Sequence, residues 1–264
     1  MLKIGLIGCG RMGRDHVRRI TEKINGAEVV AVSDVSEENA KAAAGICGAN
    51  IYTDDKALVN DPEVEALMVV SPGSLHVDEI ISGIERGIPV FTEKPMATTS
   101  ADCRRIVDAE MESGKHLVQV GFMRRFDKGY RQMKEEMDSG KYGDPLILHC
   151  THRNCYVLDD YDTPMAVHDT AIHEIDCLHW MLDEEYESAQ VIMPKSTKNA
   201  PEKLKDPQIM ILRTKSGVCI DLETFVTCRF GYDINCEIVC EEGSIAMPQP
   251  AVPVIKHEAV TRTA

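Results

Sequence analysis

Three glycines near the N-terminus have the spacing of a dinucleotide-binding loop. Gly8, Gly10 and Gly13 form the pattern G-x-G-x-x-G between an expected strand at residues 2–8 and an expected helix at residues 11–24. The first glycine permits a tight turn, the second lets the backbone approach a pyrophosphate, and the third lets helix and strand pack closely. Unpaired N–H groups at the start of such a helix attract phosphates. The loop therefore predicts a nucleotide site, and a glycine-rich turn without a ligand is the simpler alternative.

An acidic residue follows the expected second strand at residues 28–33. Asp34 could accept hydrogen bonds from both ribose hydroxyls of an adenosine and would repel a 2′-phosphate. No Arg or Lys follows before Lys41, so the cation that an NADP site needs is missing. We therefore expect NAD as the cofactor in preference to NADP. In the alternative, Asp34 is only a turn residue.

A lysine stands where α/β proteins bind ligands. Glu93-Lys94-Pro95 follows an expected strand at residues 89–91, at the carboxyl edge of the predicted sheet. The proline disfavours helical geometry at Lys94, and the ammonium group could polarise a substrate oxygen. Taken alone, the residue is better explained as an ordinary surface lysine.

A second candidate cluster lies in the long helical pattern at residues 165–182. At about 100° per residue, Asp169, His173 and Asp176 would lie on one narrow face together with Trp180. Asp169 and His173 are four residues apart, so the carboxylate could orient the imidazole and support its protonated form. The helix thus predicts a general base, with an exposed ion pair as the alternative.

The composition limits the possible partners. The 264 residues carry a formal net charge of −14, and so acidic a chain repels nucleic acids and anionic membrane surfaces. No apolar run approaches the roughly 20 residues of a membrane span. An apolar strand pattern begins at once, which leaves no room for a signal peptide. We expect a cytoplasmic protein with neither nucleic acid nor membrane as a partner.

The cysteines and histidines raise the question of disulfides or a metal. Ten cysteines occur, mostly singly in apolar stretches and without a C-x-x-C pair, which favours buried free thiols over a disulfide framework. Histidines are dense in the second half but match no zinc signature: His149, His152, His168, His173 and His179. We expect no metal.

The helices and strands that would position these residues follow one pattern in the first part of the chain and a different pattern in the second. Up to residue 121, short apolar runs alternate with helical patterns, as in a parallel sheet covered on both faces. From residue 122 strands follow one another closely, with hairpin turns at residues 215–217 and 241–243. We therefore expect a doubly wound α/β domain of the Rossmann type at residues 1–121 and an α+β domain with a mostly antiparallel sheet at residues 122–264. The other expected strands are 64–70, 116–120, 146–151, 188–193, 208–214, 218–227, 233–240 and 244–247, and the other expected helices are 37–47, 75–86, 100–113 and 127–139.

In combination, these motifs resemble the Gfo/Idh/MocA family of pyranose and polyol oxidoreductases. The glycine loop, the Glu93-Lys94-Pro95 step and the Asp169-x-x-x-His173 helix carry the resemblance. Four stretches are similar to the inositol-oxidising members of that family: residues 117–126, 152–154, 172–176 and 230–233. Members usually continue through a further helical segment beyond the point where this chain ends. The resemblance therefore implies either a fragment or a shortened variant.

The resemblance implies a homo-oligomer, usually a tetramer, that oxidises the axial hydroxyl of myo-inositol with NAD. It implies Lys94, Asp169 and His173 as the catalytic set and a cis peptide between Lys94 and Pro95. Cofactor contacts are expected from Gly8, Gly10, Arg11, Met12, Gly13, Asp34, Ser71, His76, Glu93 and Lys94. Contacts with a small neutral polyol or sugar are expected from Met123, Arg124, His152, Asn154, Asp176 and Tyr232. The alternatives are another sugar or inositol-isomer dehydrogenase or reductase of the same family, and a non-catalytic NAD-binding protein.

Overall fold

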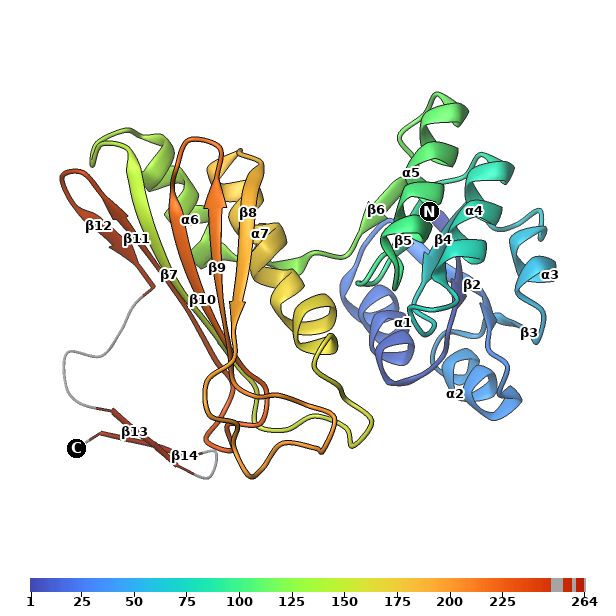
Figure 1. The fold of residues 1–264 in the computed structure, drawn as a ribbon. Helices are drawn as coiled ribbons and strands as arrows, with labels where there is room; N and C mark the ends of the chain where they lie inside the picture. Colours follow the sequence, from blue (N-terminus) through green and yellow to red (C-terminus); the bar gives the residue numbers. More distant parts are fainter. Residues whose placement is uncertain (248–253, 258–259, 264) are drawn as a thin grey trace. The chain divides into compact units, whose positions relative to one another are not determined.

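The chain folds as two compact units, Met1–Gly121 and Phe122–Ala264 (Figure 1). The computed structural model describes residues 1–247, 254–257 and 260–263, with side chains through residue 247. Each unit has its own sheet and its own buried core. The two units are therefore described separately.

The first unit is a six-stranded parallel sheet in the order β3-β2-β1-β4-β5-β6. Its strands are β1 (Leu2–Ile7), β2 (Ala27–Ser33), β3 (Asn50–Tyr52), β4 (Ala66–Val69), β5 (Val90–Thr92) and β6 (Val118–Val120). Its helices are α1 (Arg11–Lys23), α2 (Glu37–Cys47), α3 (Asp55–Val59), α4 (His76–Arg86) and α5 (Ser100–Ser113). The strand order reverses direction at β1 and β4, which is where sheets of this type bind ligands.

Helices cover both faces of this sheet, as the alternating pattern predicts. Val17 of α1 and Ala43 of α2 pack in one buried cluster with β1 and β2, and Ile80 of α4 and Ile106 of α5 pack in another with β4 and β5. The sequence analysis assigned no element to residues 50–59. β3 has only three residues at the sheet edge, and α3 has only five residues, which is too short for a helical period to be detected.

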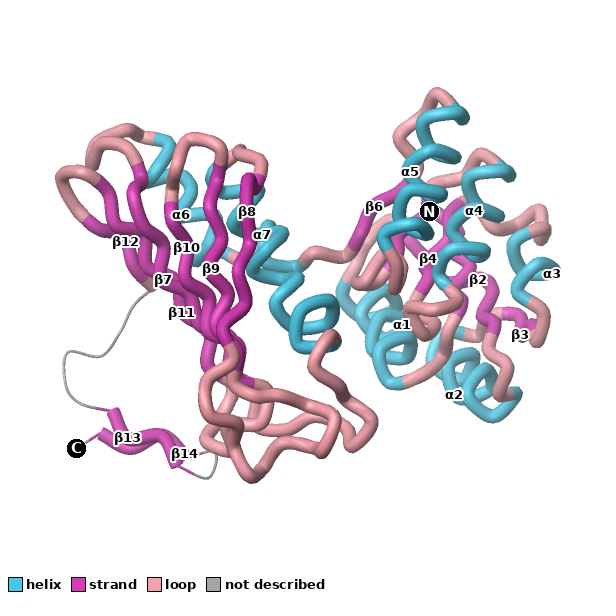
Figure 2. The backbone as a smooth tube through the Cα atoms, viewed as in Figure 1, coloured by secondary structure: helices cyan, strands magenta, loops and turns pink. Residues whose placement is uncertain are grey.

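The second unit is a six-stranded sheet in the order β12-β11-β7-β10-β9-β8, with two helices on one face (Figure 2). Only β7 and β10 run parallel; the other neighbours are antiparallel, so the expectation of a mostly antiparallel sheet is confirmed. Its strands are β7 (Pro145–Arg153), β8 (Tyr186–Ile192), β9 (Gln208–Thr214), β10 (Cys219–Phe225), β11 (Asp233–Cys240) and β12 (Ser244–Ala246). Its helices are α6 (Lys128–Asp138) and α7 (Ile172–Leu182), and β13 (Val254–His257) pairs with β14 (Val260–Thr263) as a separate hairpin.

Side chains alternate between the two faces of β7, and this places one histidine in the core. Leu148 and Cys150 are buried against the layer that contains Leu178 and Met181 of α7. His152, two residues further along, lies on the same buried face. The opposite face carries Arg153, which pairs with Glu223 and Asp233.

The expectation of one continuous α-helix at residues 165–182 is wrong in its first part. Residues Ala166–Ala171 form a π-helical turn, and the α-helix starts only at Ile172. The buried hydroxyl of Tyr161 donates to the carbonyl of Met165 at 2.8 Å and lies 2.6 Å from the hydroxyl of Thr170. A side chain that takes a carbonyl out of the regular helical ladder accounts for the wider turn.

Candidate functional site

The glycine loop after β1 has the geometry that a pyrophosphate requires. Gly8 has φ +94°, and a Cβ there would lie 2.4 Å from the backbone nitrogen of Ser71. A Cβ on Gly13 would lie 1.9 Å from the carbonyl oxygen of Gly8, so both glycines are required by close packing. A Cβ on Gly10 would meet nothing within 4 Å. The space beside Gly10 is therefore open to a ligand.

The start of α1 adds unpaired N–H groups at the same place. The helix begins at Arg11 without a side-chain cap from Gly10 and without an acidic residue in its first turn. Arg11 is exposed and Met12 is 44% exposed. Free N–H groups and the positive end of the helix dipole favour an anion here. The residues present thus fit the phosphates of NAD.

Asp34 follows β2 and is fixed by backbone donors. Its Oδ2 accepts the N–H of Cys9 at 2.8 Å and its Oδ1 accepts the N–H of Ser36 at 2.8 Å. Each carboxylate oxygen can accept more than one hydrogen bond. The side chain is thus oriented with acceptor capacity left for the two ribose hydroxyls.

Hydrogen bonds hold the side chains of Ser71 and His76 in place at this edge of the sheet. The Oγ of Ser71 donates to Glu79 at 2.6 Å. His76 is 1% exposed, with Nε2 2.8 Å from the carbonyl oxygen of Ser71 and Nδ1 2.8 Å from that of Pro95. The imidazole therefore connects the loops that follow β4 and β5. A direct contact of His76 with the cofactor stays a prediction.

Glu93 and Lys94 follow β5, as the sequence indicates, and the expected cis peptide between Lys94 and Pro95 is confirmed. Oε1 of Glu93 lies 2.7 Å from Nε2 of His16 in α1. Burial acts to raise the pKa of Glu93, but hydrogen bonds and charge interactions with His16 and Lys94 together outweigh burial and leave that pKa below its ordinary value. Glu93 is therefore an anion, and the sequence analysis did not detect its partner.

The second unit carries Asp169 and His173 in successive turns. Asp169 lies in the π-helical turn and His173 in the first turn of α7, and both are partly buried. The wider turn changes the angular spacing that an uninterrupted α-helix would give them. π-helical turns occur frequently at functional sites. The ring centroid of His173 lies 6.1 Å from that of His152 in β7.

His152 belongs to a buried charged cluster. Its Nδ1 lies 2.8 Å from Oε2 of Glu174 and 3.2 Å from Nη2 of Arg124. Arg124 Nη2 lies 2.5 Å from the other oxygen of Glu174, and Nη1 donates to the hydroxyl of Tyr130 at 3.0 Å. Among these residues Glu174 was missed by the sequence analysis. It is adjacent to His173, but no local pattern indicates that it is buried.

The other predicted substrate contacts differ in their surroundings. Asp176 is engaged by Arg125, whose Nε donates to Oδ2 at 2.8 Å and whose Nη2 pairs with Oδ1. Asn154 follows β7, and its backbone bonds to Phe225 and Cys228. Arg125 was not predicted, because the two partners of this ion pair are 51 residues apart.

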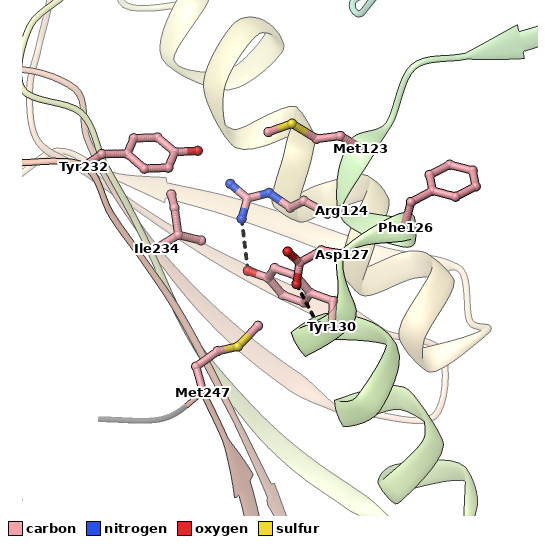
Figure 3. A pocket seen from close by; sticks show the side chains of 8 residues that line it. All are labelled: Met123, Arg124, Phe126, Asp127, Tyr130, Tyr232, Ile234 and Met247. Carbon is pink, nitrogen blue, oxygen red and sulfur yellow. Dashed lines mark hydrogen bonds between the residues drawn. The ribbon is translucent and has the colours of Figure 1, made fainter. Parts of the chain in front are cut away.

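A cavity of about 480 Å³ brings three of the predicted residues together (Figure 3). Tyr232 is 64% exposed, and its ring lies edge-on to that of His152 at 5.9 Å between centroids. Met123 is also exposed, whereas Arg124 is buried. The lining residues are Met123, Arg124, Phe126, Asp127, Tyr130, Tyr232, Ile234 and Met247.

Three further structural findings concern metals, membranes and the cysteines. In the described part of the chain, no three His, Cys, Asp or Glu side chains are grouped so that they could hold a metal ion. Over the same residues, no helix is both long and apolar enough to cross a membrane. All ten cysteines are free thiols, and Cys150 and Cys236 are in contact at 3.5 Å between sulfurs.

The fold and these side chains define a class of protein. A Rossmann-type sheet with an open glycine loop and an acidic residue after β2 binds a nicotinamide dinucleotide. Lysine, histidine and carboxylate side chains are the groups that such proteins commonly use for proton transfer at an alcohol or a carbonyl. The class is a nicotinamide-dependent oxidoreductase.

Comparison with known families identifies the class more closely. Residues 2–122 match the model of an oxidoreductase family with an NAD-binding Rossmann fold, and residues 130–246 match the GFO/IDH/MocA C-terminal domain. The chain belongs to the Gfo/Idh/MocA family of NAD-dependent oxidoreductases. The resemblance inferred from the motifs is thus confirmed.

Individual relatives share a high identity with this chain. It is 50% identical over 260 residues to an inositol 2-dehydrogenase of Burkholderia cenocepacia, covering 98% of this chain and 77% of that protein. It is 50% identical over 250 residues to inositol 2-dehydrogenase 3 of Saccharopolyspora erythraea, covering 95% and 74%. A crystal structure of myo-inositol dehydrogenase from Lactobacillus casei, in complex with NAD(H) and myo-inositol, has a TM-score of 0.92 at 41% identity. That match covers 100% of this chain and 79% of the other.

Proposed function

We propose that this chain is an NAD-dependent dehydrogenase that oxidises the axial hydroxyl of myo-inositol and yields 2-keto-myo-inositol (scyllo-inosose) and NADH. The observation that carries the proposal is the 50% identity, over 98% of the chain, to an inositol 2-dehydrogenase. The likeness to the Lactobacillus casei enzyme that binds NAD(H) and myo-inositol supports it independently.

The first unit supplies the cofactor site in this proposal. The N–H groups at the start of α1 and the open backbone at Gly10 hold the pyrophosphate, and Asp34 holds the adenosine ribose. Arg11, Met12, Ser71, His76 and Glu93 are proposed as further contacts. NAD, when bound, accepts a hydride from the carbon that carries the reacting hydroxyl.

Three side chains are proposed to accept the proton and to stabilise the charges that form in the hydride-transfer step. His173 takes the proton of the hydroxyl as the carbon–oxygen bond gains carbonyl character. Asp169 stabilises the resulting imidazolium, and Lys94 stabilises the negative charge that develops on the oxygen. Each group is suited to its task, because the amino group of a lysine donates hydrogen bonds to an oxygen and a histidine is the usual side chain for proton exchange.

Polar side chains of the second unit are proposed to recognise the remaining hydroxyls. His152, Asn154, Asp176 and Tyr232 supply hydrogen-bonding groups, and Met123 supplies apolar contact. Arg124, although it lines the same cavity, directs its guanidinium at Glu174 and Tyr130. A neutral polyol fits such a site, because vicinal hydroxyls satisfy several buried acceptors that a simple alcohol would leave unpaired.

A homo-oligomer, a tetramer by family resemblance, is part of the proposal. The face of the second sheet opposite α6 and α7 carries partly exposed apolar residues, among them Ile147 at 39% and Ile192 at 44%. A second copy of the chain would cover them. Light scattering coupled to size exclusion should give four times the mass of one chain, and a monomer at assay concentrations would contradict this. We also place the protein in the cytoplasm, where its ten thiols stay reduced.

The substrate is tested by a kcat/KM panel with NAD and myo-inositol, scyllo-inositol, glucose, xylose and lactate. We expect myo-inositol to be the best of the five, with a keto-inositol as its product. Preference for scyllo-inositol, glucose or xylose would favour another dehydrogenase of the same family. Preference for lactate would contradict the polyol site, and NAD binding without turnover on any of them would favour a non-catalytic NAD-binding protein.

A further inference from the structure

The second unit contains a buried ion pair for which the proposed chemistry gives no role. Glu174 in α7 and Arg124 are 2% and 5% exposed, and their Oε1 and Nη2 atoms are 2.5 Å apart. Burying a charge is costly unless it is paired and hydrogen-bonded. The pair is nonetheless placed against His152, which is itself only 3% exposed.

Glu174 determines which nitrogen of His152 carries the proton. Oε1 of Glu174 faces the guanidinium of Arg124 at 2.5 Å, and a carboxylate that pairs with a guanidinium only accepts hydrogen bonds. Its Oε2 lies 2.8 Å from Nδ1 of His152, so Nδ1 must be the donor. With the guanidinium of Arg124 3.2 Å from the same Nδ1, a positively charged imidazole would stand beside a like charge. In the neutral ring the remaining lone pair is then on Nε2.

The Nε2 atom of His152 is on the side of the ring away from Glu174. Within the described residues of the second unit, 122–247, both hydrogen-bond contacts of this ring are at Nδ1 and none is at Nε2. The ring lies 6.1 Å from that of His173, the proposed base, and edge-on to Tyr232 at 5.9 Å. An acceptor in this position is suited to a hydroxyl next to the reacting one.

We infer that Glu174, supported by Arg124, is a positioning residue that holds His152 as the Nδ1–H tautomer, so that Nε2 accepts a hydrogen bond from a substrate hydroxyl. The inference rests on the proposed function for the identity of the substrate, and on the contacts of Glu174 for the tautomer. The expected role of Arg124 changes from a substrate contact to a structural support, because its guanidinium pairs with Glu174 and donates to the hydroxyl of Tyr130. A ligand without a neighbouring hydroxyl would leave Nε2 unpaired, so the tautomer contributes to specificity for adjacent hydroxyls.

The tautomer can be measured without substrate, by ¹⁵N NMR of the histidine ring nitrogens. The variant is Arg124→Met/Glu174→Leu, because removing both charges leaves no unpaired buried ion and such replacements often preserve folding. Comparison with His152→Gln assigns the His152 signals. We expect the Nδ1–H form in the wild type and a shift toward Nε2–H, the form that histidine favours in water, in the double variant. The Nε2–H form in the wild type, or an unchanged tautomer in the double variant, would overturn the inference.

Steady-state kinetics provide the second readout. We expect the double variant to lose roughly 10- to 100-fold in kcat/KM for myo-inositol, as removal of an orienting partner typically does, with unchanged affinity for NAD. Glu223→Gln is the matched control: it breaks another Arg–carboxylate pair of the same sheet, that of Arg153, whose side chain lies on the opposite face of β7 from the ring of His152. An equal loss in the control would overturn the inference. If the wild type oxidises no polyol, the proposed function fails, while the NMR result still decides the tautomer.

Discussion

The backbone N–H of Cys9 donates to Oδ2 of Asp34 at 2.8 Å, which ties the glycine loop to the end of β2. Oδ1 of the same carboxylate accepts the N–H of Ser36 at 2.8 Å. The side chain is therefore held in one orientation by two backbone groups of the loops that surround the proposed adenosine site. A fixed carboxylate at this place repels a 2′-phosphate and accepts from ribose hydroxyls.

Cofactor preference tests this relationship. Because an unpaired, desolvated charge contact costs on the order of 1–3 kcal/mol, we expect kcat/KM with NAD to exceed that with NADP by about 10- to 100-fold. Asp34→Asn removes the negative charge but keeps one acceptor oxygen. We expect this variant to have a higher kcat/KM with NADP, and so a smaller ratio between the kcat/KM values for NAD and NADP. Equal values for both cofactors in the wild type would remove Asp34 from the cofactor site.

His173→Ala and Lys94→Ala test the proposed proton transfer. Loss of a general base or of the group that stabilises the developing charge should lower kcat by about 10²-fold or more in each variant. The dissociation constant of NADH, measured by fluorescence, should stay close to that of the wild type for His173→Ala. Full activity in either variant would exclude that residue from the catalytic set.

The buried carboxyl of Glu79 predicts a pH-dependent stability. Burial raises its pKa to about 7, although the hydrogen bond from Ser71 acts in the opposite direction. The folded protein therefore holds this proton more tightly than the unfolded chain, so the contribution of Glu79 is fully present below the pKa of the unfolded chain, about 4.5, and is lost as the pH rises to about 7. The loss amounts to at most about 3 kcal/mol of unfolding free energy.

Urea unfolding of the wild type and Glu79→Gln at several pH values between those limits measures this contribution. The glutamine stays neutral, so the wild type should lose stability relative to the variant as the pH rises. Glu85→Gln, at an exposed position of the same helix, is the control and should follow the wild type. Parallel curves for the wild type and Glu79→Gln would contradict the prediction.

The sequence predicts well those features that depend on neighbouring residues. The glycine loop, the strand–helix alternation and the hairpin turns are encoded within a few positions, and the structure confirms the parallel and the mostly antiparallel sheet. The cis bond between Lys94 and Pro95 was expected from the family resemblance, and the structure confirms it.

Contacts between distant residues could not be predicted in this way. Arg125 and Asp176 are 51 positions apart, and His152 and Glu174 are 22 positions apart. The π-helical turn is accompanied by a hydrogen bond from the hydroxyl of Tyr161, which lies outside the helix, to the carbonyl of Met165 just before the turn. From helical periodicity, Asp176 was expected on the same helix face as Asp169 and His173. Periodicity carries no information on Arg125, so the ion pair between Asp176 and Arg125 could not be predicted.

The central claim, direct hydride transfer from myo-inositol to NAD, is tested most directly with substrate that carries deuterium on the carbon of the axial hydroxyl. With unlabelled NAD, the account predicts that the NADH formed contains the deuterium at C4 of the nicotinamide ring. Where hydride transfer limits turnover, the account also predicts a lower kcat with the labelled substrate than with ordinary myo-inositol. NADH without deuterium, or no reduction of NAD in the presence of myo-inositol, would contradict the account.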